Sequence, residues 1–337
     1  MPERKILRKD SIPVSFMIEQ LTSRVGIQVE IVGTAPMGER RVVERNLHRP
    51  ALVMIGYAEL FQFQRVQVLG NTECRYLAHL TPDARAEAFG RLVAFDLPCI
   101  AVTAGNTLDQ SLVEMADARG IPVLRTETST TQFMNLLSDF LNDQFAQQTT
   151  VHASLVDVYG VGLMLMGKSG IGKSEVALDL VERGHRLVAD DVVVVTRKEE
   201  GILIGAGTDL VQHFMEIRGL GLIDVRAMFG IRAIRFQKRI EIAVNMQVWD
   251  GQEEHTRLGM IDDFYNVLGV DLPLVKLPIT PGKNVTVICE VIAMNYLLQH
   301  YGYDAAVVFA KRLADRISSK RDGVVARATE YFENDNE

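Results

Sequence analysis

The sequence predicts an α/β protein with a small N-terminal parallel α/β domain and a C-terminal domain built around a phosphate-binding loop. Two observations carry this prediction. Between residues 82 and 125, helix-like and strand-like segments alternate, which is typical of a parallel sheet with crossover helices. Further along, Gly167 to Ser174 matches the pattern G-x-x-x-x-G-K-[ST] and lies between an apolar strand-like run and a helical pattern. The 337 residues are enough for two domains.

The composition is that of an ordinary soluble globular protein, with 47% apolar and 23% charged residues. Asp and Glu (43) outnumber Lys and Arg (36), and the net charge of −7 argues against general binding to nucleic acid or to an anionic membrane. We see no signal peptide, and no run of 18 apolar residues could span a bilayer. Cys74, Cys99 and Cys289 are isolated in the sequence, so we expect buried free thiols in a reducing cytoplasm rather than a disulfide or a zinc site.

The N-terminal domain is expected over residues 1–134. Apolar spacing predicts a helix over 11–25. Strands are predicted from β-branched content and turn signals at 25–32, 51–55, 65–70, 99–103 and 121–124. A helix over 108–119, ending at Gly120, lies between the last two strands and supports the parallel arrangement.

The polar stretch 126–131 marks a break, and a helix over 131–146 follows it. We therefore expect a connector helix and linker over 135–150, a catalytic domain over 151–322 and a frayed tail over 323–337. In the catalytic domain, strands 151–158 and 161–166 form a hairpin at Tyr159-Gly160. Further strands are predicted at 186–195, 202–205 and 239–248, and helices at 289–300 and 303–318.

The phosphate-binding loop consists of Gly167, Lys168, Ser169, Gly170, Ile171, Gly172, Lys173 and Ser174. A strand, a glycine loop and a helix in this order aim backbone N–H groups and the positive end of the helix at phosphate oxygens. Lys173 would hold the β- and γ-phosphates, and the Ser174 hydroxyl would bind Mg²⁺. The alternative is a glycine-rich turn that opens an ordinary helix.

Four further clusters accompany this loop. His152 lies near a strand end, where a structural role is the commoner one. Asp190 and Asp191 could bind Mg²⁺ or accept a substrate proton. Alternatively, they could be a solvated strand end. They lie at the start of an apolar strand rather than at its close. In the third cluster, Glu216 could be a metal ligand beside Arg218, Gly219 and Gly221. The fourth is a turn with Pro278, Pro281, Gly282 and the cation Lys283, and each of these two clusters could instead be a plain loop. Arg257 lies in a stretch that is expected to face solvent.

Taken together, these motifs resemble bacterial HPr kinase/phosphorylase. The resemblance rests on His152, G-K-S-G-I-G-K-S-E at 167–175, R-G-H-R-L-V-A-D-D at 183–191, E-I-R-G-L-G-L-I-D at 216–224 and P-I-T-P-G-K-N at 278–284. The N-terminal half agrees, with R-P-A-L at 49–52, G-N-T-E at 70–73 and G-I-P-V-L-R-T at 120–126. Two positions depart from the family pattern: Lys168 replaces an expected Asp, and Lys283 replaces a common Arg, which keeps charge but loses bidentate geometry.

The resemblance implies a cytoplasmic, bifunctional, Mg²⁺-dependent enzyme that phosphorylates a seryl residue of HPr, the phosphocarrier of the sugar phosphotransferase system, with ATP or pyrophosphate. It implies that the same enzyme removes this phosphate by phosphorolysis, that it is a homohexamer, and that its catalytic domain resembles the nucleotide domain of phosphoenolpyruvate carboxykinase. His152, Lys173, Asp191 and Arg257 match the family's active-site residues, and Ser174 and Glu216 match its Mg²⁺ ligands. The segment 215–224 matches the part needed in both directions, and 278–283 the part needed for dephosphorylation.

Two other functions remain open on the residues alone. One is a small-molecule kinase with a phosphate loop, and the other is a nucleotide-gated regulator that binds a protein partner without turnover. The segments 216–221 and 278–284 argue against the first, because a metabolite kinase has no evident need for them. Asp190 and Asp191 beside Lys173 argue against the second, because a sensor could lose the acid.

Overall fold

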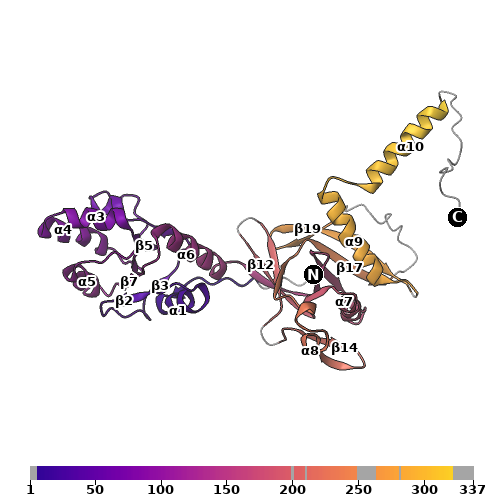
Figure 1. Ribbon diagram of the computed structural model, residues 1–337, viewed down its shortest axis with the longest axis horizontal. Coiled ribbons are helices and arrows are strands. Elements are labelled where there is room, and N and C mark those ends of the chain that lie inside the picture. Colours follow the sequence, from indigo (N-terminus) through magenta and orange to yellow (C-terminus); the bar gives the residue numbers. More distant parts are fainter. Residues whose placement is uncertain (1–5, 199–200, 209–210, 249–262, 281, 322–337) are drawn as a thin grey trace. The chain divides into compact units, whose positions relative to one another are not determined.

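The computed structural model describes residues 6–198, 201–208, 211–248, 263–280 and 282–321. The chain divides into two compact units, the first formed by Met1–Gln148 with Thr196–Gly201 and the second by Thr149–Val195 with Ile202–Glu337. Each unit has its own hydrophobic cores and is described separately (Figure 1).

The first unit is built on a five-stranded sheet with the order β2-β7-β6-β5-β4. Strands β4 to β7 are parallel to one another, and β2 is antiparallel to β7, which confirms the predicted parallel α/β arrangement. Strands β1 and β3 form a separate two-stranded antiparallel pair. The strands are β1 (Ile12–Pro13), β2 (Glu30–Val32), β3 (Arg41–Val42), β4 (Leu47–His48), β5 (Val66–Leu69), β6 (Ile100–Val102) and β7 (Val123–Arg125).

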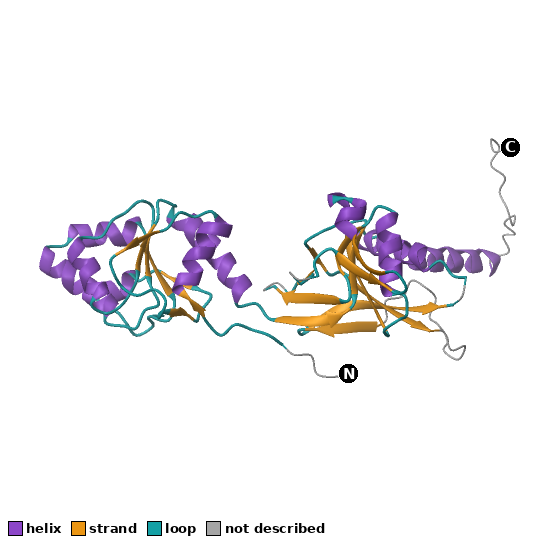
Figure 2. Cartoon of the chain, turned by 90° about the horizontal axis from the view of Figure 1, so that it is seen from below, coloured by secondary structure: helices purple, strands orange, loops and turns teal. Residues whose placement is uncertain are grey.

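Helices cover both faces of this sheet (Figure 2). Ala101 of β6 packs in the core with α1 and α6, whereas its neighbours Ile100 and Val102 pack in the core with α3, α4 and α5, because successive strand residues point to opposite faces. The helices are α1 (Val14–Gln20), a π-helical turn (Leu21–Val25), α2 (Ala51–Met54), α3 (Asn71–His79), α4 (Pro82–Val93), α5 (Gln110–Asp117) and α6 (Thr130–Gln144).

Two segments of the first unit differ in detail from the sequence expectations. The strand predicted at 51–55 is wrong, because this segment is the short helix α2. Its adjacent residues Val53 and Met54 are both buried, whereas Leu52 and Ile55 are exposed, which is not the alternation of a strand. The helix expected as a connector is α6, and it buries Phe133, Leu137, Phe140 and Leu141 in the core of the first unit.

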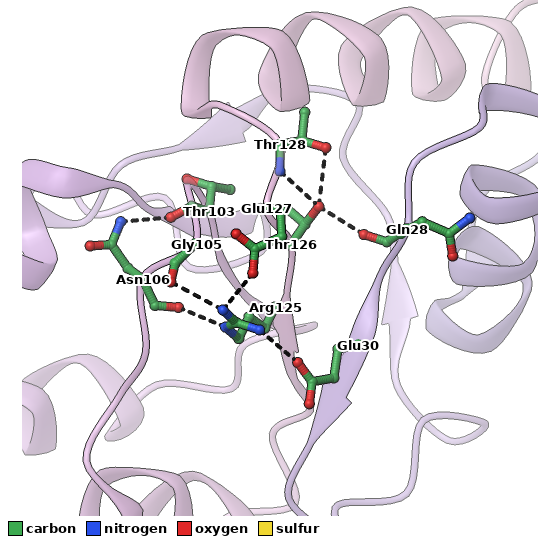
Figure 3. Close-up of polar contacts among 9 residues, drawn as sticks. All are labelled: Gln28, Glu30, Thr103, Gly105, Asn106, Arg125, Thr126, Glu127 and Thr128. Carbon is green, nitrogen blue, oxygen red and sulfur yellow. Dashed lines mark hydrogen bonds and ion pairs between the residues drawn. The ribbon is translucent and has the colours of Figure 1, made fainter.

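Arg125 organises the carboxyl edge of this sheet (Figure 3). Its guanidinium donates to the carbonyl oxygens of Asn106 (3.1 Å) and Gly105 (3.2 Å) and to the carboxylates of Glu30 (2.9 Å) and Glu127 (2.6 Å). Thr126 donates to the carbonyl of Gln28. These bonds hold the loop after β6 against β7 and β2, so the role of this network is to fix the loops of the first unit.

The second unit contains a six-stranded sheet, a four-stranded sheet and a small hairpin. The six-stranded sheet has the order β11-β9-β10-β17-β19-β18, in which β10, β17 and β19 are parallel. Its strands are β9 (Ser154–Val158), β10 (Val161–Gly167), β11 (Arg186–Ala189), β17 (Ile242–Val248), β18 (Asp263–Val267) and β19 (Val270–Ile279). The four-stranded sheet has the order β16-β13-β12-β8 and consists of β8 (Gln148–His152), β12 (Val192–Arg197), β13 (Leu203–Ala206) and β16 (Gln237–Arg239).

The larger sheet is packed on both faces. Leu163 and Leu165 of β10 lie in the core that includes helices α7 and α9, and Met164 and Met166 lie in the core shared with the four-stranded sheet. Glu290 of α9 connects the two helices, because Arg183 and His185, which follow α7, bond to its carboxylate. The hydrogen bonds from Arg183 lower the pKa of Glu290. The remaining elements are α7 (Lys173–Glu182), β14 (Phe214–Ile217), β15 (Gly221–Asp224), α8 (Val225–Phe229), a 3₁₀ turn (Ile231–Ala233), α9 (Val285–His300) and α10 (Ala305–Arg321).

Two predicted strands are each interrupted in the structure. The segment 151–158 is divided between β8 and β9 at Ala153, and 186–195 between β11 and β12 at Asp190-Asp191. At each break the chain passes from one sheet to the other, and the Ala153 N–H donates to the Asp191 carbonyl (3.2 Å). Apolar residues on both sides of each break hide this change of sheet in the sequence. Asp190 and Asp191 therefore directly follow the apolar strand β11 as well as precede β12. The expectation that they lie at the start of a strand and not at the close of one is corrected.

The structure agrees with the predictions for the burial of the cysteines and for membrane spans. Cys74, Cys99 and Cys289 are buried free thiols, and burial raises the pKa of Cys99 and of Cys289 to about 12. Among the residues that the structure describes, none of the helices is both long enough and apolar enough for a transmembrane span.

Candidate active site

The glycine loop connects β10 to α7 and requires its glycines. A Cβ atom on Gly167 would lie 2.5 Å from the Met246 carbonyl oxygen of the neighbouring strand, and Gly172, the N-cap of α7, has a φ of +102°. The loop can therefore lie close to β17 and turn directly into the helix. This geometry presents the N-terminal N–H groups of α7, which have no partner within the helix, to a bound anion.

Lys173 is the first residue of α7 and is almost completely buried. Its Nζ lies 3.4 Å from the Gly167 carbonyl oxygen and 3.4 Å from His152 Nε2. The ammonium group is thus held inside the loop, next to the end of β8. Lys168, by contrast, is exposed.

The two neighbouring carboxylates have different environments. Asp190 is only 5% exposed and accepts hydrogen bonds from Ser154 Oγ (2.5 Å) and Ser174 Oγ (2.8 Å). Burial raises the pKa of Asp190, and the two serine hydrogen bonds oppose this rise. The side chain of Asp191 is 67% exposed, its φ is +63°, and its Oδ1 lies 2.9 Å from His152 Nδ1. Asp190 is therefore tied into the protein, while Asp191 is accessible to a substrate.

The hairpin of β14 and β15 forms another wall of the site. Glu216 lies on β14, and the turn that follows carries Arg218 and Gly219. The Arg218 guanidinium lies against Gly170 of the phosphate loop, where a Cβ atom would be 2.7 Å from Nη1. The hairpin thereby brings one carboxylate and one cation to the loop.

These elements enclose a cavity of about 300 Å³. Most of the residues predicted for the site line it: His152, Ser169, Gly170, Gly172, Lys173, Ser174, Asp190, Asp191, Glu216, Arg218, Gly219 and Gly221. The lining does not include Gly167, Lys168, Ile171, Pro278, Gly282 or Lys283, and Ile171 packs instead against the core below. Arg257 and Pro281 lie outside the described residues.

Three residues of this region were not predicted from the sequence to be functional. Glu175 and Ile217 line the cavity, and the fully buried Ser154 holds Asp190. Ser154 and Asp190 are 36 positions apart, so their contact depends on the pairing of β9 with β11. The only local signal was a hydroxyl within an apolar strand next to His152.

The oxygen donors at one side of the cavity fit Mg²⁺. Ser174 Oγ and Asp190 Oδ2 lie 2.8 Å apart, and the Glu216 carboxylate faces the same cavity. In the described part of the chain, there is no group of three or more His, Cys, Asp or Glu side chains that could hold a metal ion. The oxygens of Ser174, Asp190 and Glu216 would supply part of a coordination shell, which suits an ion that keeps water and phosphate ligands.

A glycine loop at a helix N-terminus, a buried lysine and an accessible carboxylate define the class of proteins that bind and transfer phosphoryl groups. The chain belongs to the HPr serine kinase family. The family model described as "HPr Serine kinase C-terminal domain" matches residues 143–313, and "HPr Serine kinase N terminus" matches residues 13–141. These matches confirm the family that the sequence motifs resemble.

Relatives of this family match almost the whole chain. A protein of Chloroherpeton thalassium named HPr kinase/phosphorylase is 52% identical over 335 residues, covering 99% of this chain and 98% of the relative. A protein of Chlorobaculum tepidum with the same name is 48% identical over 337 residues, covering 99% and 98%. A solved structure, described as the Hpr(Ser) kinase/phosphatase from Coxiella burnetii, is 30% identical and covers 48% of this chain and 97% of its own, with a TM-score of 0.41.

Proposed function

We propose that this protein is a bifunctional HPr kinase/phosphorylase that transfers a phosphoryl group from ATP, or from pyrophosphate, to a seryl hydroxyl of HPr and removes it with inorganic phosphate. The observation that carries the proposal is the meeting of Lys173, His152 and Asp191 at one phosphate-binding loop in a chain of this family. The substrate and the supply of ATP imply the bacterial cytoplasm as the place of action.

In the kinase direction, the seryl oxygen attacks the γ-phosphorus and the bond from this phosphorus to the bridging oxygen of ADP breaks. Asp191, which is accessible, takes the hydroxyl proton, and Lys173 stabilises charge on the phosphoryl oxygens. In the reverse direction, a phosphate oxygen attacks the phosphoserine phosphorus, and Asp191 returns the proton to the departing seryl oxygen. The products are then serine and pyrophosphate.

His152 acts in this scheme as a positioning residue. Its Nδ1 contacts Asp191 and its Nε2 faces the ammonium of Lys173, so the imidazole fixes the distance between the acid and the cation. Mg²⁺, bound by Ser174 and Glu216 together with phosphate and water, would neutralise phosphate charge. Asp190 would orient the Ser174 hydroxyl for this purpose.

The direct test of the proposal is incubation of the protein with purified HPr, Mg²⁺ and ATP, followed by intact-mass measurement of HPr. We expect the mass of one phosphoryl group to appear, and phosphoserine to be found on digestion. A small-molecule kinase would leave HPr unchanged while consuming ATP with another substrate. A regulator without turnover would bind ATP and HPr but leave both intact.

The turn after β19 is proposed to favour the phosphorolysis reaction. Strands β10, β17 and β19 are parallel, so the phosphate loop and the turn with Lys283 follow strand ends at the same edge of the sheet. Two strand spacings, roughly 10 Å, separate the ends of β10 and β19. Lys283→Ala should lower phosphorolysis several-fold more than kinase activity, because only the reverse reaction brings free phosphate to an anionic phosphoserine and needs the additional cation.

Initial rates in both directions on the same preparation of Lys283→Ala test this division. Raising the phosphate concentration should partly restore phosphorolysis. Lys283→Arg is the matched control and should retain both rates, because it keeps the charge. Equal losses in the two directions, or no loss in either, would show that the lysine has no direction-specific role.

The assembly that we propose is a homohexamer in which α10 helps to dock HPr between subunits. Figure 1 shows α10 extending away from α9, and its Val307, Phe309, Leu313 and Ile317 are exposed. Most of the stability of a helix in a protein comes from the packing of its apolar face, so the exposed apolar side chains of α10 favour a partner. This exposure supports docking over packing of α10 on its own domain.

Truncation before residue 303 should therefore weaken HPr phosphorylation at least tenfold, through a raised KM for HPr, while ATP affinity stays within twofold of wild type. Titration with ATP and a kinetic series in HPr concentration measure the two effects. The double variant Lys311→Ala/Arg312→Ala, which keeps the apolar face, is the matched control. An equal loss of ATP and HPr binding would instead indicate that α10 stabilises its own domain.

A further inference from the structure

Ser154 places a fully buried hydroxyl group in an apolar strand. It is the first residue of β9 and pairs with Leu165 of β10. Val156 and Val158, which share its face of the strand, lie in the apolar core. Burial of a hydroxyl group without a hydrogen bond is unfavourable, so a polar residue at this position requires a partner. The partner is Asp190, whose Oδ1 accepts the Ser154 hydroxyl proton at 2.5 Å.

The backbone around the acid pair is held by the same segment. The Val192 N–H donates to the Asp190 carbonyl (2.7 Å) across Asp191, whose φ is +63°, and these features are those of the rare, strained form of the γ-turn. Strained backbone persists only where the surrounding contacts hold it. The Ala153 N–H holds the Asp191 carbonyl (3.2 Å), and Ser154 holds the Asp190 carboxylate. Two consecutive residues thus direct one carboxylate into the protein and leave the other outside.

The second oxygen of Asp190 orients the Ser174 hydroxyl group. Ser174 Oγ donates to Asp190 Oδ2 at 2.8 Å. A hydroxyl group has one donor proton and two acceptor lone pairs, so this bond directs the proton into the protein and leaves the lone pairs available to a ligand in the cavity. Mg²⁺ binds oxygen lone pairs and would be repelled by a proton turned toward it. The orientation of Ser174 therefore depends on Asp190, and that of Asp190 depends on Ser154.

We propose that Ser154 is a positioning residue for Mg²⁺, which orients the Ser174 hydroxyl through Asp190 and thereby sets the affinity of the site for the metal–nucleotide complex. Groups that orient metal ligands without touching the metal typically contribute about 10- to 100-fold to metal affinity. Ser154 is not among the residues that line the cavity, so its effect should fall on metal binding and not on phosphoryl transfer. The inference rests on the proposed function for its metal and its nucleotide.

The proposal is tested by calorimetric titration of the full chain with adenylyl-imidodiphosphate, a non-hydrolysable ATP analogue, with and without Mg²⁺. Mg²⁺ should raise the affinity of the wild type for this nucleotide. In Ser154→Ala, the affinity without Mg²⁺ should stay within twofold of wild type, while the affinity with Mg²⁺ should fall roughly tenfold. An affinity that falls equally with and without Mg²⁺, or does not fall, would overturn the proposal.

Ser154→Thr and Ser154→Val form a matched pair, because their side chains have nearly the same volume and only threonine keeps the hydroxyl group. Any cost of the added volume in the packed strand is common to both variants. The threonine variant should keep the gain in affinity from Mg²⁺, and the valine variant should lose it. Val156→Ala, which removes apolar atoms from the same face of β9, should lower thermal stability without changing this gain. An equal gain in the threonine and valine variants would show that the hydroxyl group has no role in metal binding.

The kinetics of HPr phosphorylation provide a second measurement. Ser154→Ala should raise the KM for Mg²⁺ roughly tenfold, while kcat at saturating Mg²⁺ stays within threefold of wild type. A lowered kcat beside an unchanged KM for Mg²⁺ would contradict the positioning role. A wild-type chain that does not phosphorylate HPr would refute the proposed function alone, because the nucleotide titration would still decide the role of Ser154.

Discussion

Replacing Lys173 by alanine is expected to abolish both phosphorylation of HPr and its reversal. The Lys173 ammonium is buried within the loop, 3.4 Å from the Gly167 carbonyl oxygen, where it would hold ATP phosphates in one direction and free phosphate in the other. Loss of one preorganised charge in a phosphoryl-transfer site costs about 10²- to 10³-fold in rate. Coupled assays of both reactions on the same preparation measure the two losses.

The control for this variant is Arg119→Ala, which removes an exposed cation from the first unit and should leave both rates unchanged. Thermal unfolding of Lys173→Ala should remain cooperative, because Lys173 is the first residue of α7 and alanine is a good helix former. Phosphorolysis near the wild-type rate in Lys173→Ala would mean that the two directions use different sites.

The second large effect is expected for Asp191→Asn. The amide cannot accept the seryl proton, so both directions should fall by about 10²- to 10⁴-fold, as is usual when a general base is removed. Asparagine tolerates the left-handed conformation that Asp191 adopts (φ +63°), so the backbone at the break between the sheets should keep its shape. Affinity for ATP should change little, because Asp191 contacts His152 rather than the loop.

Both rates and ATP affinity are to be measured on Asp191→Asn beside Asp179→Asn, which makes the same chemical change on the exposed face of α7. The Asp179 variant should behave as wild type. A kinase rate in Asp191→Asn within tenfold of wild type would exclude Asp191 as the proton acceptor and shift attention to another group at the cavity.

The phosphate loop could be predicted because its chemistry is local in the sequence. Eight consecutive residues specify the glycine turns, the lysine and the start of the helix, and in the structure β10 ends at Gly167 and α7 begins at Lys173. The pairing of Val158 with Val161 likewise confirms the hairpin at Tyr159-Gly160. In these places the sequence signal lies within a few consecutive residues.

The rest of the site depends on contacts that no local pattern contains. The sequence could not show that Asp190 would be buried by Ser154 and Ser174 while Asp191, one residue later, would stay exposed beside His152. The break that separates them arises where the chain passes from one sheet to the other. Apolar residues flank the break on both sides and mask it, because β11 and β12 are both partly buried.

The short helix α2 was missed for a similar reason. Its four residues are too few to display a helical period, and β-branched content together with turn signals favoured a strand. Its identity depends on burial of Val53 and Met54 against α4 and neighbouring elements. Roles for Arg257 and Pro281 rest on the family resemblance, since both lie outside the described residues.

The central claim is that one site runs phosphoryl transfer in both directions and uses phosphate, not water, as the acceptor in the reverse reaction. The most direct measurement follows the label of HPr carrying ³²P-phosphoserine after incubation with the enzyme and unlabelled phosphate. The account predicts that the label appears in pyrophosphate, that its release requires added phosphate, and that Lys173→Ala and Asp191→Asn both prevent it. Label released as inorganic phosphate at a rate independent of added phosphate would show hydrolysis, and would contradict the account.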